Sequence, residues 1–189
     1  MKLRAFVSLV MALVLASLTF TSVSAVEDAM VYVGHGIPGE ALGLDQALPV
    51  DVLVNDAICL LEGFEFGKFA GPVPLAPDTY NIKILLADEE NPCGGTLVIE
   101  ADVPFEAGEN TTVIAHLTAD GSPGAGDVLG LGITASKFVN DVSPAVIGST
   151  RLTVRHVAKA PAVDIELKRG WHRGRLVVEV EDLENPQQA

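Results

Sequence analysis

One pattern occurs twice in this chain of 189 residues. The segment V-Y-V-G-H at 31–35 is followed by P-V-D-V at 49–52, and L-T-V-R-H at 152–156 is followed by P-A-V-D-I at 161–165. The histidines that end these segments, His35 and His156, lie about the length of one small domain apart. We therefore expect one complete module followed by the start of a second copy.

The first 25 residues have the pattern of a cleaved signal peptide. Lys2 and Arg4 form a basic start, residues 5–20 are apolar and uncharged, and V-S-A at 23–25 matches a small-residue cleavage site. A membrane anchor is the alternative, but the apolar run is shorter than the roughly 20 residues that span a bilayer. The expected protein is secreted, extracellular or periplasmic, with no integral membrane segment after cleavage.

Charge excludes some partners of the expected mature chain, residues 26–189. It retains 10 of the 12 basic residues, because Lys2 and Arg4 are lost, and all 25 acidic residues. Such a surface repels phosphate backbones and anionic lipids, so nucleic acid is excluded as a partner and anionic membranes are disfavoured. Solubility outside the cell is the simplest role for this charge.

The chain has two cysteines, Cys59 and Cys93. An even number in an exported protein indicates a disulfide, here closing a loop of roughly 35 residues. A metal or redox pair is the alternative, but neither cysteine belongs to a C-x-x-C motif.

Apolar residues alternate with polar ones in several segments after residue 26. This period of two is typical of half-buried strands, and it occurs within 80–86, 97–103, 113–117 and 176–180. Clusters of proline and glycine separate these segments, as turns do. Tyr80 follows a turn at the start of a strand, where its hydroxyl can bond back to the backbone, as in a tyrosine corner. The sequence therefore predicts an all-β fold, an Ig-like antiparallel β-sandwich followed by an incomplete second copy.

The repeat also sets the expected domain boundaries. Residues 29–142 form the first module, 143–150 a linker, and 151–189 a partial second module. A sandwich needs two facing sheets, and 39 residues supply about three strands. We expect the partial second module to be the least stable part of the mature chain, and to pack on the first module or pair its strand edge with another chain.

The order of the motifs resembles the DUF4397 domain. The resemblance rests on V-x-V-x-H, P-x-D-V, F-E-F-G at 64–67 and the proline-led turn before Thr79 and Tyr80, and then on the second V-R-H and P-A-V-D. It covers roughly 30–189. The family comprises exported bacterial proteins, often in tandem, without an established activity. The resemblance therefore implies a fold and a cell-envelope or extracellular location, with no catalytic residues.

Histidines and aspartates are the first candidates for chemistry. The repeat signature consists of His35, Asp51, His156 and Asp164. The chain has two further histidines, His116 and His172. They could form a metal site or an acid–base pair. No H-x-H, H-E-x-x-H or H-x₃-H occurs, and His35 and His156 end the apolar faces of their strands. We expect hydrogen-bonded structural histidines, each able to contact its aspartate, and assign no metal, catalytic or cofactor residue.

Other reactive patterns are weak. Ser122, Ser136, Ser143 and Ser149 lie outside any G-x-S-x-G motif, and the glycine-rich segment 121–126 lacks the context of a phosphate-binding loop. The acidic segment 88–91 could ligate calcium, but a solvated turn is the simpler interpretation.

Two classes of function remain. The first is a non-enzymatic exported module that binds an envelope component, a partner protein or itself, including self-association through the partial second module. The second is a secreted hydrolase or metal-binding enzyme whose groups come from loops and scattered histidines. Convergence of three ligand groups would favour the enzyme.

Overall fold

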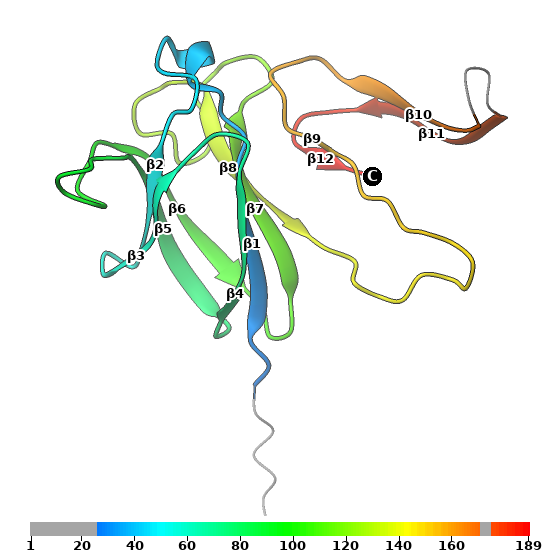
Figure 1. Ribbon diagram of the computed structural model, residues 1–189, viewed down its shortest axis with the longest axis horizontal. Helices are drawn as coiled ribbons and strands as arrows, with labels where there is room; N and C mark the ends of the chain where they lie inside the picture. Colours follow the sequence, from blue (N-terminus) through cyan, green and yellow to red (C-terminus); the bar gives the residue numbers. More distant parts are fainter. Residues whose placement is uncertain (1–25, 171–174) are drawn as a thin grey trace, which may run out of the picture.

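The computed structural model describes residues 26–170 and 175–189, and strands dominate it (Figure 1). In the first module the strands are β1 Ala29–His35, β2 Val50–Val54, β3 Ile58–Phe64, β4 Phe69–Leu75, β5 Asp78–Leu86, β6 Leu97–Phe105, β7 Asn110–Leu117 and β8 Ile133–Val139, with a helical turn η1 at Gly39–Leu42. The later strands are β9 Arg155–His156, β10 Val163–Arg169, β11 Arg175–Leu183 and β12 Gln187–Gln188. The described residues contain no helix that is long and apolar enough to cross a membrane. The predicted signal peptide and His172 lie outside the described residues.

Two four-stranded sheets form the first module. One has the order β4-β1-β7-β8 and the other the order β3-β2-β5-β6. The sequence prediction of an all-β sandwich is confirmed, whereas the Ig-like assignment stays a prediction. One pairing differs from the antiparallel expectation, because β1 and β7 run parallel. Period two specifies which face of a strand is buried, but it does not specify the neighbour or its direction.

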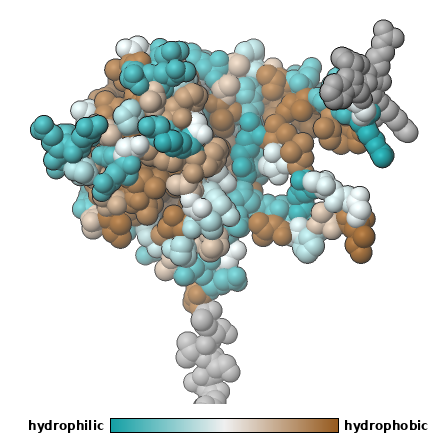
Figure 2. Space-filling view, viewed as in Figure 1, coloured by the Kyte–Doolittle hydropathy of each residue, from teal (hydrophilic) through white to brown (hydrophobic). Residues whose placement is uncertain are grey.

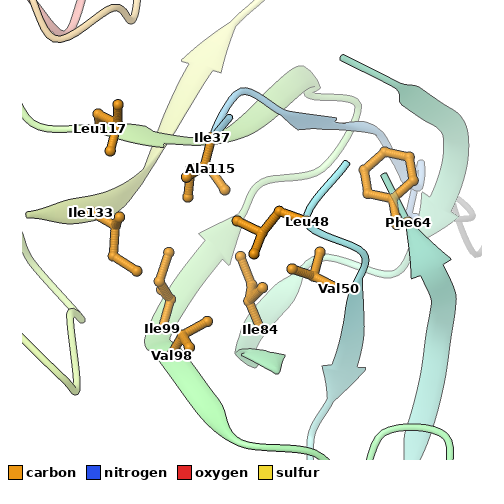
Figure 3. Close-up of a cluster of buried hydrophobic side chains, with 10 residues drawn as sticks. All are labelled: Ile37, Leu48, Val50, Phe64, Ile84, Val98, Ile99, Ala115, Leu117 and Ile133. Atoms are coloured by element: carbon orange, nitrogen blue, oxygen red, sulfur yellow. The ribbon is translucent and has the colours of Figure 1, made fainter. Parts of the chain in front are cut away.

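The core lies between the two sheets, where the inward residues of the predicted strands meet (Figure 3). The alternation of β5 is confirmed: Tyr80, Ile82, Ile84 and Leu86 all pack in the core clusters. The main buried cluster consists of Ile37, Leu48, Val50, Phe64, Ile84, Val98, Ile99, Ala115, Leu117 and Ile133. A smaller cluster of Ala29, Val31, Phe105 and Val113 extends it along the sandwich.

Tyr80 has the hydrogen bond that its place in the sequence predicts. Its hydroxyl donates to the carbonyl of Ala76, four residues earlier, at 2.9 Å. The ring packs beside Phe105 with 5.9 Å between centroids. This contact joins the turn before β5 to the core.

Strand β7 is more deeply buried than its alternation suggests. Val113, Ala115 and Leu117 are buried as predicted, but Thr112, Ile114 and His116 on the other face are buried as well. Arg155 of the later strand β9 lies over the ring of Phe138, which is opposite Thr112 on β8, so part of this outer face is covered by a distant segment. The pattern of residues alone could not identify this cover.

Residues 151–189, which we call the partial second module after the prediction above, contain two small sheets in their described part, β10-β11 and β12-β9. The expected strand through Leu152, Val154 and His156 is shorter in the structure. β9 contains only Arg155 and His156, although Val154 exchanges two backbone hydrogen bonds with Ala189. Leu152 is exposed. In the first module β1 lies between β4 and β7, whereas β9 pairs only with β12 among the described residues, which leaves it without a second neighbour to extend it.

Candidate functional site

The two signature histidines make equivalent contacts. His35 Nε2 lies 2.9 Å from the carbonyl oxygen of Leu48, and its Nδ1 accepts the backbone N–H of Ile37 at 3.3 Å. His156 Nε2 lies 3.0 Å from the carbonyl oxygen of Pro161, and its Nδ1 accepts the N–H of Ala158 at 3.4 Å. Since a carbonyl oxygen only accepts, both rings carry their proton on Nε2. Each histidine holds the connection that leads to the next strand.

The two signature aspartates also have equivalent roles. Asp51 Oδ1 accepts the N–H of Gly63 at 2.8 Å, and Asp164 Oδ1 accepts the N–H of Asp182 at 3.0 Å. Each donor has a positive φ and lies in a bulge where two residues oppose one aspartate. Contrary to the possibility raised from the sequence, the hydrogen bonds of each aspartate are to backbone groups, and none joins it to its histidine.

The predicted disulfide is present between Cys59 and Cys93. It joins the edge strand β3 to the connection between β5 and β6, so neither cysteine is available as a metal or redox ligand. Asp51 Oδ2 accepts the backbone N–H of Cys93 at 2.8 Å. Asp51 is only 1% exposed, and its carboxylate ties β2, the bulge in β3 and the disulfide loop together.

The structure brings His116 and Ser136 together, a pair that sequence reasoning missed. His116 Nδ1 lies 2.8 Å from the carbonyl oxygen of Leu117, and Nε2 lies 2.8 Å from Ser136 Oγ. Nδ1 therefore carries the proton, and Nε2 can accept the serine hydroxyl. The imidazole is fully buried, and a carbonyl occupies the position that a carboxylate has in a Ser-His-Asp triad. No local motif could reveal the pair, because the residues come from adjacent strands.

The other candidates for chemistry form local turns. The hydroxyls of Ser122, Ser143 and Ser149 donate to groups two or three residues away. Asp88 accepts the N–H groups of Glu90 and Asn91, which makes the acidic segment a turn. Within residues 26–170 and 175–189, no three His, Cys, Asp or Glu side chains converge as a metal site would require.

An apolar cavity of about 220 Å³ lies at one end of the first module. Its walls come from the β1–β2 and β7–β8 connections and from the strands beneath them, and the lining residues include Leu44, Leu129 and Leu131. His35 is the only polar side chain in the lining, and both of its ring nitrogens are already bonded. The cavity therefore offers no free side-chain hydrogen-bonding group to a ligand.

A larger groove of about 420 Å³ lies in the partial second module and beside the linker. It is lined by Ala145, Val146, Ser149, Thr150, Arg151, Leu152, Val154, Ile165, Leu167, Val178, Val180 and Ala189. Figure 2 shows hydrophobic surface over this part of the molecule, at the right of the view. The lining is mostly aliphatic, like the interior of a sandwich, but this groove is open to solvent.

The corresponding positions in the first module are closed. Each hairpin has a bulge opposite its signature aspartate. Superposing these two bulges aligns β2 with β10, so Val54 corresponds to Leu167. Val54 is 5% exposed and Leu167 is 44% exposed. β2 pairs with β3 on one side and β5 on the other, whereas among the described residues β10 pairs only with β11. The partial second module therefore presents a free strand edge beside an apolar groove.

A few polar contacts join the partial second module to the first. Asn185 Nδ2 donates to the carbonyl of Leu117 at 2.9 Å, and Gln188 Nε2 donates to the carbonyl of Val139 at 3.0 Å. The guanidinium of Arg155 lies over the ring of Phe138 and donates to Asn140. These contacts involve β9 and the C-terminal residues, so β10 and the groove keep their exposed face.

The family model described as "Domain of unknown function (DUF4397)" matches residues 29–166. The matched segment begins at the first residue of β1 and continues through the linker into β10. No curated protein and no solved structure matches the chain.

Proposed function

Because the chain belongs to the DUF4397 family, whose activity is not known, we propose a function from the geometry: this is an exported, non-enzymatic module that binds a protein partner by strand addition. The partner contributes an extended segment that pairs with the free edge of β10 and covers the groove. Strand addition of this kind takes affinity from backbone hydrogen bonds and specificity from alternate side chains.

The contrast between two equivalent hairpins carries this proposal. Hairpin β2–β3 of the first module has β5 on its open edge, and hairpin β10–β11 has the same bulge but no such neighbour among the described residues. Exposed apolar surface beside an unpaired edge favours pairing with another chain. A closed module would bury both features.

Strand β5 itself suggests what the β10 edge would accept. In the first module Ile82, Lys83 and Ile84 lie opposite Val54, Leu53 and Val52. Transferred to β10 through the shared bulge, the same register sets Ile82 opposite Leu167, Lys83 opposite Glu166, and Ile84 opposite Ile165. Two apolar pairs then face the groove, and one pair of opposite charges faces outward.

A peptide with the sequence of residues 78–86, D-T-Y-N-I-K-I-L-L, is the direct probe. We expect the labelled peptide to bind the chain that begins at residue 26, and a scrambled peptide of the same composition to bind more weakly. Substitution Leu167→Asp should reduce binding at least about tenfold, because it puts a charge into the apolar face. Fluorescence anisotropy measures both affinities.

Ile58→Asp is the matched control. Ile58 is also an exposed aliphatic residue on a strand, with 58% of its surface accessible, but it belongs to the first module. Peptide binding should survive this change. Equal binding of the scrambled and native peptides, or equal binding by the Leu167→Asp variant, would contradict strand addition.

A secreted hydrolase is the second candidate, and the contact between His116 and Ser136 favours it. The tautomer of His116 suits a general base, but the ring is buried and its Nδ1 contacts a carbonyl. Hydrolysis of p-nitrophenyl acetate distinguishes the candidates. Turnover that Ser136→Ala abolishes would support the hydrolase, and turnover indistinguishable between this variant and the unmodified protein would exclude it.

A further inference from the structure

We infer that the partner on the β10 edge is a second copy of this chain, paired through β10 about a two-fold axis that passes beside Leu167. This inference rests on the proposed strand addition and specifies its occupant. Two chains would then form one continuous sheet in the order β11-β10-β10-β11.

The first module contains the template for such a sheet. Its sheet β3-β2-β5-β6 consists of two hairpins, and the central strands β2 and β5 run antiparallel. A two-fold axis beside β10 also makes its two copies antiparallel, since an isologous contact pairs the same surface on both chains. The dimer thus repeats an arrangement that this sequence already forms within one chain.

The charges on β10 select one register. Ile165 and Leu167 line the groove, so the alternation of a strand directs Asp164, Glu166 and Lys168 to the outward face. An axis beside residue 164, 166 or 168 puts a residue opposite its own like charge, and an axis beside residue 165 puts Asp164 opposite Glu166. An axis beside Glu166 also sets Asp164 opposite Lys168, but it puts the two Glu166 carboxylates opposite each other. Only an axis beside Leu167 pairs opposite charges without a facing like-charged pair, Glu166 of each chain facing Lys168 of the other.

The ion pair already present within the chain fits this register. Lys168 Nζ contacts the Glu166 carboxylate of its own strand, and both side chains are about half exposed. The two groups are therefore free to exchange partners when a second chain arrives. In the dimer each glutamate gains a lysine across the strands, and the two Leu167 side chains meet over the groove.

Charge reversal tests this register. Lys168→Glu creates two pairs of facing glutamates, and Glu166→Lys creates two pairs of facing lysines. We expect each single variant to dimerise about tenfold or more weakly than the original chain, because each of two cross-strand pairs changes from attraction to repulsion. An equimolar mixture of the two variants should form heterodimers, because every facing pair is again of opposite charge. Sedimentation velocity at 0.15 M salt, where the Debye length is about 8 Å, measures these species.

Lys68→Glu is the matched control. Lys68 is exposed, and it also pairs with a glutamate on its own chain, Glu65, but it lies in the first module. This variant should dimerise like the original chain. The inference is overturned if the chain stays monomeric up to about 100 µM, roughly the dissociation constant of weak transient complexes. It is also overturned if the mixture dimerises no more tightly than the single variants. If the peptide of residues 78–86 still binds that monomer, the proposed strand addition is supported and only the identity of the partner is wrong.

Discussion

Single residues fix the connections of this fold by contacts with backbone groups. His35 holds the β1–β2 connection through the carbonyl of Leu48 and the amide of Ile37, and His156 repeats both contacts. The sequence predicted structural histidines at these positions. The sequence suggested that His35 could contact Asp51, which it does not. Its backbone partners could not be predicted, because they depend on how the β1–β2 connection folds against the strand.

The buried histidines should make stability depend on pH. Burial lowers the pKa of His35 and of His116, and in each case a hydrogen bond to a backbone carbonyl, of Leu48 or of Leu117, opposes the shift by less. Below about pH 6.5, the pKa of an unperturbed histidine, the unfolded chain therefore binds protons that the folded chain does not. The free energy of unfolding should fall as the pH decreases from 7.5 towards 5.5.

Urea unfolding across this range measures the effect. The carboxylates, which titrate near pH 4 in the unfolded chain, contribute little above pH 5.5. His116→Asn should lower the overall stability but flatten the pH dependence, because one titrating group is gone. A variant with an undiminished slope would contradict the assignment of this dependence to His116.

At the scale of elements, the two hairpins β2–β3 and β10–β11 share a bulge but differ in their covalent support. The disulfide and Asp51 tie β3 to the β5–β6 connection. The partial second module contains no cysteine. The even number of cysteines and the expected export were sufficient to predict the pairing, because two cysteines allow one intramolecular bridge.

Removal of this bridge should destabilise the first module strongly. The two cysteines are separated by 34 residues, and a loop of this length corresponds to about 3–4 kcal/mol of stabilisation by restriction of the unfolded chain. Urea unfolding with and without a reducing agent measures the difference, and no other cysteine complicates the result. The unreduced, unfolded chain should have no thiol that reacts with Ellman's reagent. Two reactive thiols would be inconsistent with the bridge.

At the scale of the whole molecule, burial is distributed unevenly. The first module has a core between two sheets, whereas His156 and Leu183 are the only buried side chains among residues 151–170 and 177–189. The linker exposes Val146 and Ile147. A segment that buries so little apolar surface does not offset the entropy of ordering its backbone, about 1–2 kcal/mol per residue.

Limited proteolysis should therefore remove the partial second module first. We expect a dilute monomer to be cut by trypsin after Arg155, Lys168 or Arg175 before any site within 29–142, which leaves a resistant core that contains 29–142 and ends at or before Arg155. Mass spectrometry of the fragments identifies the cuts. Complete protection of 149–189 in the dilute monomer would mean that docking on the first module is sufficient to stabilise it.

The sequence by itself determined the strands with clear alternation, the turns between them, the disulfide and the hydrogen-bonding hydroxyl of Tyr80. The strands, the turns and the Tyr80 bond depend on alternation, on turn-forming residues and on a residue four positions away, so they are encoded locally. The disulfide is not local, but a chain with only two cysteines allows a single intramolecular pairing. Only the tertiary structure decided the parallel pairing of β1 with β7, the contact of His116 with Ser136 and the bond from Asp51 to Cys93. Each of these joins residues that are far apart in the chain, and strand alternation specifies a buried face without specifying which strand lies beside it.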